Sequence, residues 1–214
     1  MKVVLADDHR MVRDGLRAVL ERAGVEVVGE AATGHEALAE VRRKRPDVVV
    51  MDIGMPELNG IDATKRMVAE LPGTKVLGLS MNADRRYVIA MLEAGAVGYL
   101  LKNSASEELL NALEAVVRGE TYLSSAITGS VVARAIQGSP ATRWGEERPL
   151  TVREREVLQL VAEGKSSKEI GVILHIAVPT VETHRRQIVE KLNLRTIAEL
   201  TKYAIREGLT STER

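Results

Sequence analysis

Five polar side chains stand where short apolar runs of the sequence end: Asp7, Asp8, Asp52, Ser80 and Lys102. A carboxylate beside a cation can attack phosphorus and form an acyl phosphate. Carboxylates gathered at one place repel one another, and Mg²⁺ suits their oxygen ligands and the oxygens of a phosphoryl group. Ser80 could donate a hydrogen bond to one phosphoryl oxygen, and Lys102 could pair with another. This chemistry requires the five side chains to lie together.

Asp52 by itself permits two interpretations. It follows the apolar residues 48–51 and precedes a string of turn residues that ends at Asn59-Gly60. Such a run suits a buried parallel strand, and parallel sheets bind ligands beyond the carboxyl ends of their strands. Asp is also a common turn residue, so Asp52 could simply cap the loop.

The chain up to residue 119 alternates short apolar runs with segments of helical spacing. We expect strands at residues 2–6, 25–31, 48–52, 75–80 and 98–102. We expect helices at residues 9–23, 33–43 and 61–71, a fourth capped by Asn82, and a fifth opened by the capping box of Ser104 and Glu107. This alternation predicts a doubly wound, flavodoxin-like parallel sheet of five strands. Its strands would end at one edge, which brings the five polar side chains together.

At 214 residues the chain exceeds the commonest single-domain size. We expect a first domain at residues 1–120, a linker at 121–149 with a short helix over 125–137, and an all-helical domain at 150–214. The absence of cysteine excludes disulfides, thiolate metal sites and cysteine nucleophiles. No apolar run approaches the roughly 20 residues that span a bilayer, and acidic residues follow the N-terminus at once. We therefore expect a cytoplasmic protein with no membrane partner.

The C-terminal part contains three capping boxes: Thr151 with Glu154, Ser166 with Glu169, and Thr196 with Glu199. They predict three helix starts, and a fourth helix should begin near Pro179. Its residues Val181, Ile188 and Leu192 form a core-facing side. A helix, a tight turn and a polar helix make up the helix-turn-helix plan, in which the second helix enters the major groove of DNA. A plain helical bundle would also fit this pattern.

Basic side chains concentrate between residues 165 and 195, although the formal net charge of the chain is zero. The cations are Lys165, Lys168, Arg185, Arg186, Lys191 and Arg195, and the anions are Glu169, Glu182 and Glu190. The excess suits a polyanion such as DNA, although a charge run is more often a solvated face.

The N-terminal motifs resemble those of response-regulator receiver domains: Asp7-Asp8, Asp52 in Met-Asp-x-x-Met-Pro-x-x-Asn-Gly, Ser80, and Tyr99-Leu100-Leu101-Lys102. The resemblance implies that Asp52 accepts a phosphoryl group from a histidine kinase and that Ser80 and Tyr99 relay the phosphorylated state. It also implies a Mg²⁺ site made by Asp8, Asp52, the Gly54 carbonyl and, through water, Asp7. Such a domain catalyses only its own phosphoryl transfer and dephosphorylation, so we do not expect an enzyme. We expect His9 to be a surface residue at a helix start, because Mg²⁺ prefers oxygen.

The C-terminal motifs resemble the LuxR-type DNA-binding domain: Leu150-Thr151-x-Arg153-Glu154, Gly164-Lys165-Ser166-x-Lys168-Glu169, Thr180-Val181-x-x-His184 and Lys191-Leu192. A receiver followed by this module is the NarL/FixJ type of response regulator. The resemblance implies an operator in double-stranded DNA, a homodimer when active, and RNA polymerase as a further partner to consider. The implied DNA contacts are Lys165, Ser166, Lys168, Thr180, Val181, Glu182, Thr183, His184, Arg185, Arg186 and Lys191.

Three residues depart from the LuxR-type pattern. Ala177 stands where many members have a capping Ser, and Pro179 lies in the first turn, so the second helix could begin one residue late. Glu182 occupies a position that is often basic, which could shift base preference toward cytosine.

Three other functions would fit parts of this pattern. A phosphohydrolase with the same nucleophile has a second Asp as general acid, but position 54 is Gly. A ligand-sensing LuxR-type regulator would need a small-molecule pocket instead of the acidic residues and Lys102. A stand-alone receiver with a protein-binding tail would not shift DNA in a gel.

Overall fold

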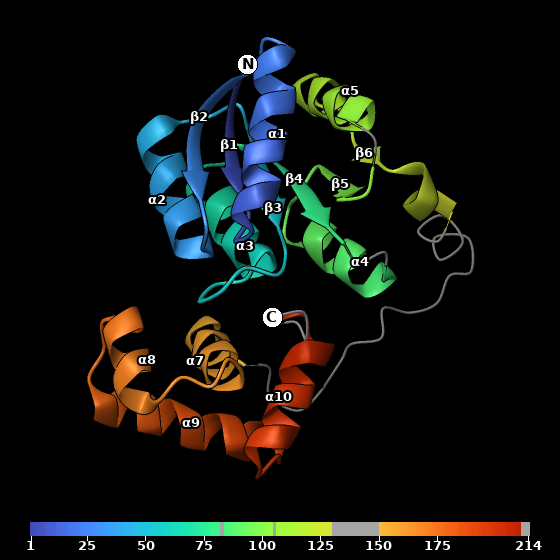
Figure 1. Ribbon diagram of the computed structural model, residues 1–214. Helices are drawn as coiled ribbons and strands as arrows, with labels where there is room; N and C mark the ends of the chain where they lie inside the picture. Colours follow the sequence, from blue (N-terminus) through green and yellow to red (C-terminus); the bar gives the residue numbers. More distant parts are fainter. Residues whose placement is uncertain (82–83, 105, 130–149, 211–214) are drawn as a thin grey trace. The chain divides into compact units, whose positions relative to one another are not determined.

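A computed structural model of the chain describes residues 1–81, 84–104, 106–129 and 150–210 (Figure 1). The chain divides into two compact units, one built around a β-sheet and one built from helices. Each unit has its own core of buried aliphatic side chains. Two separate cores are consistent with the two folded domains expected from chain length.

The first unit is built on a parallel sheet. Its strands are β1 (Lys2–Ala6), β2 (Glu26–Ala31), β3 (Val48–Asp52), β4 (Lys75–Ser80), β5 (Gly98–Leu101) and β6 (Tyr122–Leu123). They lie in the order β2-β1-β3-β4-β5-β6, and every neighbouring pair is parallel. The doubly wound parallel sheet is therefore confirmed.

The prediction of five strands was wrong, because β6 adds a sixth in the described residues. β6 lies within 121–149, the range expected to be linker. The backbone N–H groups of Tyr122 and Ser124 donate to the carbonyls of Val97 and Tyr99 at the edge of β5. A strand of two residues carries no alternation of apolar and polar side chains, so the sequence pattern could not reveal it.

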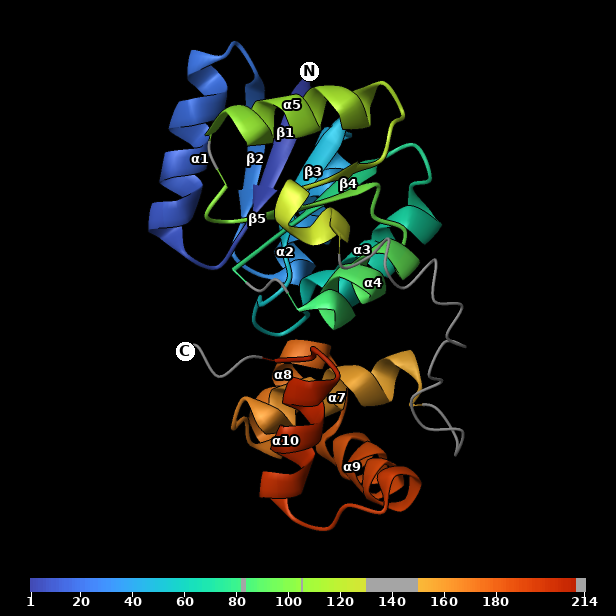
Figure 2. The same ribbon diagram turned by 90° about the vertical axis from the view of Figure 1, so that its right-hand side faces the viewer.

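Helices cover both faces of the sheet (Figure 1 and Figure 2). α1 (Arg10–Arg22) and α5 (Ser106–Val117) contribute Leu20, Leu109 and Leu113 to the core on one face. α2 (Gly34–Lys44), α3 (Gly60–Glu70) and α4 (Arg85–Glu93) contact one another in that order and cover the other. With both faces covered, the carboxyl edge of the sheet is the place where polar groups gather.

The helix starts test the predicted caps. Thr33 caps α2 as expected by accepting a hydrogen bond from the Glu36 N–H. α4 is capped by Asp84, so the prediction of Asn82 was wrong; Asn82 itself lies outside the described residues. α5 begins at Ser106, and the box predicted for Ser104 is untested because residue 105 is not described.

Residues 125–129 are helical, as the first part of the short helix predicted over 125–137. The remainder of that helix and the predicted linker up to residue 149 lie outside the described residues.

The second unit consists of α7 (Val152–Ala162), α8 (Ser167–Leu174), α9 (Val178–Leu192) and α10 (Ile197–Arg206). All three predicted capping boxes are present, with Thr151, Ser166 and Thr196 as the caps. Side chains from all four helices meet in one core that includes Leu158, Ile170, Val181, Ile188 and Leu200. No helix in the described part of the chain is long and apolar enough to cross a membrane.

Candidate functional site

The carboxyl ends of β1, β3 and β5 bring Asp7, Asp52 and Lys102 into contact. Lys102 Nζ lies 2.7 Å from Asp7 Oδ2 and 3.0 Å from Asp52 Oδ2. The three side chains are nearly inaccessible, with exposed fractions of 7% for Lys102, 2% for Asp7 and 6% for Asp52. The parallel sheet therefore assembles the group predicted from the strand ends. We call Asp7, Asp8, Asp52 and Lys102 the acid pocket.

Burial and neighbouring charges act together on the pKa values of Asp52 and Lys102 in the acid pocket. Burial raises the pKa of the Asp52 carboxyl above its ordinary value; Lys102 lowers this pKa, while Asp7 and Asp8 raise it further. Burial by itself would lower the pKa of Lys102, but the carboxylates of Asp52 and Asp7 outweigh it and raise that pKa. Lys102 therefore keeps its charge at neutral pH, and the pocket favours positive charge beside Asp52.

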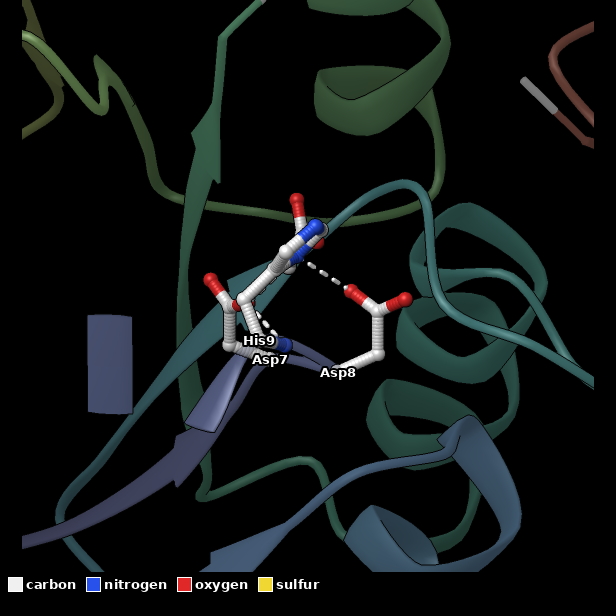
Figure 3. A group of neighbouring side chains, drawn as sticks. Asp7, Asp8 and His9 are labelled. Atoms are coloured by element: carbon white, nitrogen blue, oxygen red, sulfur yellow. Dashed lines mark hydrogen bonds and ion pairs between the residues drawn. The ribbon is translucent and has the colours of Figure 1, made fainter. Parts of the chain in front are cut away.

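Asp8 and His9 complete the acidic group. One ligand atom from each of Asp7, Asp8, His9 and Asp52 lies within 4.8 Å of the others. Figure 3 shows the His9 ring beside the Asp8 carboxylate, with Nδ1 2.8 Å from Asp8 Oδ1 and 3.4 Å from Asp7 Oδ1. The His9 side chain is 58% exposed, as expected for a helix start, but its contact with the aspartates was not foreseen. Three convergent carboxylates are a donor set that fits a hard cation such as Mg²⁺.

Backbone groups of the loop after β3 fix the position of Asp52. The Asp52 carboxylate accepts a hydrogen bond from the Ile53 N–H, and the Gly60 N–H donates to the Ile53 carbonyl. A Cβ on Gly60 would lie 1.9 Å from the backbone oxygen of Asp52, so no other residue fits there without moving the loop. Asn59 caps α3 next to it. Gly54, the predicted carbonyl ligand, lies in this loop and is half-buried.

Ser80 and Tyr99 lie on neighbouring strands next to the pocket. Ser80 ends β4, and Tyr99 on β5 is fully buried. Burial raises the pKa of the Tyr99 phenol to about 12, and a hydrogen bond with Ser80 acts in the opposite direction. Tyr99 pairs with Gly78 on β4, where a Cβ would lie 3.3 Å from the Tyr99 ring. Gly78 therefore leaves room for the buried ring.

In the second unit, α8 and α9 form the predicted helix-turn-helix. α8 ends at Leu174, and its C-cap is His175, whose φ of 53° lies in the left-handed region; the Ile176 N–H donates to the Gly171 carbonyl. A Cβ on Gly171 would lie 2.8 Å from the Ile176 oxygen, so the turn requires glycine.

The start of α9 settles the question raised by Ala177 and Pro179. α9 begins at Val178, with Ala177 as a cap that lacks a side-chain bond and with Pro179 in the first turn. The prediction that this helix could begin one residue late was wrong. Proline is tolerated in the first turn of a helix, because the N–H group that it lacks would have no hydrogen-bond partner within the helix.

The predicted DNA-contact residues separate into exposed and internal groups. Thr180, Glu182 and Arg186 of α9 are exposed, as are Ser166 and Lys168 at the start of α8. Lys165, Thr183, His184 and Arg185 are half-buried. We call Thr180, Glu182, Thr183, Arg185 and Arg186 the α9 surface.

Two of the predicted DNA-contact residues have contacts inside the domain. Val181 is fully buried in the core, which confirms the predicted apolar side of α9 and removes its side chain from the contact set. Lys191 Nζ lies 2.6 Å from the carboxylate of Glu154, which is itself 2% exposed. The contact of Lys191 with DNA stays a prediction, but an ion pair within the unit already uses its charge.

Comparison with known families identifies both domains. Residues 3–114 match the response regulator receiver domain, and residues 148–204 match the luxR family of bacterial regulatory proteins. The chain belongs to the NarL/FixJ-type response regulators. It is therefore a regulator of transcription that joins a receiver to a LuxR-type domain.

Individual relatives extend over the whole response regulator. The oxygen regulatory protein NreC of Staphylococcus carnosus is 41% identical and covers 98% of this chain and 99% of its own. A LuxR-family response regulator from Aurantimonas is 35% identical with a TM-score of 0.61, over 63% of this chain and 97% of its own. RcsB, in a structure of two dimers bound to two DNAs, is 26% identical with a TM-score of 0.58, over 97% and 98%.

The sequence analysis missed Arg13, which supports the acid pocket of this response regulator. Its guanidinium donates to the Asp7 carbonyl through Nη1 and to Glu30 through Nε, and 14% of the side chain is exposed. Arg13 interrupts the apolar spacing of α1 next to the sheet, which is the signal that could have revealed it. A half-buried arginine on a core-facing side usually has a carboxylate partner.

Proposed function

We propose that Asp52 is the phosphoacceptor of this response regulator and that a histidine kinase supplies the phosphoryl group. The observation that carries the proposal is the Lys102 ammonium, held between the buried carboxylates of Asp7 and Asp52. Attack by an Asp52 oxygen places new negative charge next to that ammonium, which stabilises it at no reorganisation cost. Such transfer is the domain's own reaction and makes the protein a phosphoacceptor rather than an enzyme.

A Mg²⁺ ion would be held by Asp8, Asp52 and the Gly54 carbonyl, with Asp7 assisting through water. The ion would supply charge neutralisation for the phosphoryl oxygens. Arg13 would keep the Asp7 backbone in place from behind. Lys102 would remain paired with Asp7, and this pairing would keep the Lys102 ammonium in place to contact a phosphoryl oxygen on Asp52.

Ser80 and Tyr99 would relay the phosphorylated state. A Ser80 hydroxyl that turns to a phosphoryl oxygen must change its hydrogen bond with Tyr99, because each hydroxyl has one proton to donate. A Cβ on Gly78 of β4 would lie 3.3 Å from the buried Tyr99 ring and 3.0 Å from Met91 of α4, so a change in the packing of the ring can reach α4 at the surface of the domain.

The output would be sequence-specific binding of double-stranded DNA through the α9 surface, with Lys165, Ser166 and Lys168 at phosphates. We place the receiver at residues 1–120, the linker at 121–149 and the DNA-binding domain at 150–214. Helix-turn-helix proteins commonly bind paired half-sites as dimers, and we propose a homodimer as the active form. We propose RNA polymerase as a further partner of the protein. The protein would act in the cytoplasm, where it meets DNA and the kinase.

The phosphoacceptor is tested by labelling the intact chain with radioactive acetyl phosphate and Mg²⁺. The wild type should take up alkali-labile label, and Asp52→Asn should take up none. Asp8→Asn should need more Mg²⁺ and label more slowly, because it loses a charged ligand. Asp14→Asn, which changes an exposed carboxylate on α1, is the matched control and should behave as the wild type. Normal labelling of Asp52→Asn would rule out the proposed nucleophile.

Regulation is tested by comparing residues 150–214 with the intact chain on one operator fragment, before and after phosphorylation. If the receiver restrains the DNA-binding domain, the short chain binds regardless and the unphosphorylated intact chain binds more weakly. A shift from 99:1 closed to 99:1 open corresponds to about 5.5 kcal/mol. Equal affinities in all three samples would leave dimerisation or polymerase contact as the regulated step.

A further inference from the structure

The hydroxyl of Ser167, at the first residue of α8, connects two charged side chains of α9. It donates a hydrogen bond to Glu182 Oε1 and accepts one from Arg185 Nη1, at 2.9 Å. A serine hydroxyl has one proton and two lone pairs, so it can make both bonds at once. Ser167 thus joins the first helix of the helix-turn-helix to the α9 surface.

Glu182 and Arg185 also face each other, with Arg185 Nη1 3.8 Å from Glu182 Oε1. The Glu182 side chain is 56% exposed and the Arg185 side chain 33% exposed. An exposed pair three residues apart on a helix is only weakly held by its own attraction. The Ser167 hydroxyl supplies the additional contacts that fix both side chains in one arrangement.

A carboxylate on a DNA-facing helix is repelled by phosphates unless its charge is compensated. Here Arg185 lies beside Glu182, and the amino-terminal end of α8 adds partial positive charge next to Ser167. A compensated carboxylate in the major groove can accept a hydrogen bond from the N4 amino group of cytosine.

We propose that Ser167 is a positioning residue that orients Glu182 and Arg185 to read one cytosine-containing base pair. This inference rests on the proposed DNA binding and deepens it by naming the base pair and the residue that fixes its reader. Ser167 itself need not touch a base, since it acts through the two side chains of α9.

The test selects sequences from a random duplex library with the intact chain, phosphorylated by acetyl phosphate and Mg²⁺. The wild type should enrich a C·G pair at one position of each half-site. Ser167→Ala should lower that preference about fivefold or more, which corresponds to the lower end of the discrimination that a single base contact provides. Ser167→Thr keeps a hydroxyl and should retain the preference. Thr201→Ala, which removes a hydroxyl from α10, is the control.

Combined substitutions separate positioning from direct contact. Because Ser167 acts through Glu182 and Arg185, adding Ser167→Ala to a variant that carries Glu182→Ala and Arg185→Ala should cause no further loss of C·G preference. A phosphate contact by Ser167 would instead lower affinity for every sequence alike and add to the effect of these substitutions, with the salt dependence unchanged because serine carries no charge. That pattern would overturn the positioning role.

Failure of the two proposals is distinguishable. A wild-type chain that enriches no sequence would overturn the DNA-binding proposal together with this inference. A wild type that enriches a site, with Ser167→Ala enriching the same site at the same C·G preference, would overturn the inference alone. Thermal unfolding of Ser167→Ala should match the wild type closely, because Ser167 lies outside the buried core and Ser166 provides the cap of α8.

Discussion

The acid pocket draws its side chains from strand ends far apart in the sequence, whereas the α9 surface comes from consecutive turns of one helix. Lys102, Asp7 and Asp52 are almost completely buried, while Glu182 and Arg186 are exposed. When buried charged groups share partners, replacing one of them leaves another charge unpaired and destabilises the fold. Exposed groups on a helix can be exchanged with little effect on folding.

This difference suits the two tasks. A phosphoacceptor site has to hold one fixed geometry for one chemistry, and burial provides it. A DNA-reading surface has to change its base preference between related regulators while the fold stays the same. The difference predicts that substitutions around the acid pocket cost stability and chemistry together, and that substitutions on the α9 surface change selectivity alone.

The largest effect should come from Gly60→Ala, because the new methyl group would lie 1.9 Å from the Asp52 backbone oxygen. Neither atom belongs to a flexible side chain, so the loop behind Asp52 must move. We expect a loss of roughly 3 kcal/mol or more in the free energy of unfolding and a loss of acetyl phosphate labelling.

Gly73→Ala is the matched control for Gly60→Ala. A Cβ at Gly73 meets nothing within 4 Å, and its φ is not positive, so stability should change by no more than about 1 kcal/mol. Normal labelling and stability of Gly60→Ala would show that the loop is less constrained than its geometry indicates.

The second prediction tests whether the helix-turn-helix unit also contains a buried ion pair that stabilises its fold. Lys191→Met keeps the aliphatic stem but leaves the buried Glu154 carboxylate without its ammonium partner. We expect a loss of roughly 2 kcal/mol, discounted because Lys191 is partly exposed. Lys202→Met on the exposed side of α10 is the control and should be near neutral.

The Lys191 prediction has a defined pH dependence. Burial raises the pKa of Glu154, but bonds from Lys191 and Thr151 outweigh it and hold the pKa below its ordinary value. A lowered folded-state pKa stabilises the protein above the unfolded-state pKa, about 4.3, and this stabilisation is lost as the pH falls through the folded-state value. The stability gap between wild type and Lys191→Met should therefore shrink in acid. If wild type and Lys191→Met were equally stable at pH 7, the ion pair with Glu154 would not contribute to stability.

The third effect separates base readout from phosphate contact on the α9 surface. Arg186→Ala should cost about 1–3 kcal/mol of discrimination between operator and random DNA, with unchanged stability. Lys168→Ala should weaken binding to all sequences alike and reduce the slope of log affinity against log salt by about 1. Gel shifts over a salt series measure both. An equal loss on operator and random DNA for Arg186→Ala would make Arg186 a phosphate contact.

The smallest effect concerns backbone strain away from both sites. Arg45, the C-cap of α2, has a φ of 47°, in the left-handed region that favours glycine. Arg45→Gly should stabilise the protein by about 0.5–1 kcal/mol, and Asn193→Gly at the end of α9 by less, because asparagine tolerates this region. Thermal unfolding of both variants measures the difference, and a loss of stability in Arg45→Gly would contradict the strain argument.

Features that depend on residues within a few positions of one another were predictable from the sequence. The capping boxes of Thr151, Ser166 and Thr196 are all present, because both partners lie within one helical turn. The position of the acid pocket was also predictable, since parallel strands must end at one edge. There the sequence determined which side chains gather, because the alternation of strands and helices leaves few arrangements of a parallel sheet.

Features that depend on a distant partner were decided by the tertiary structure. The edge strand β6 exists because β5 offers backbone groups to it, and its two residues carry no pattern of their own. Lys191 could face DNA or its own domain, and the packing of α9 against α7 brings it to Glu154. Gly60 became indispensable only once the loop passed against the Asp52 backbone. Spacing along the chain determines local hydrogen bonds, but the partner of a long side chain or a close backbone approach depends on how the elements pack.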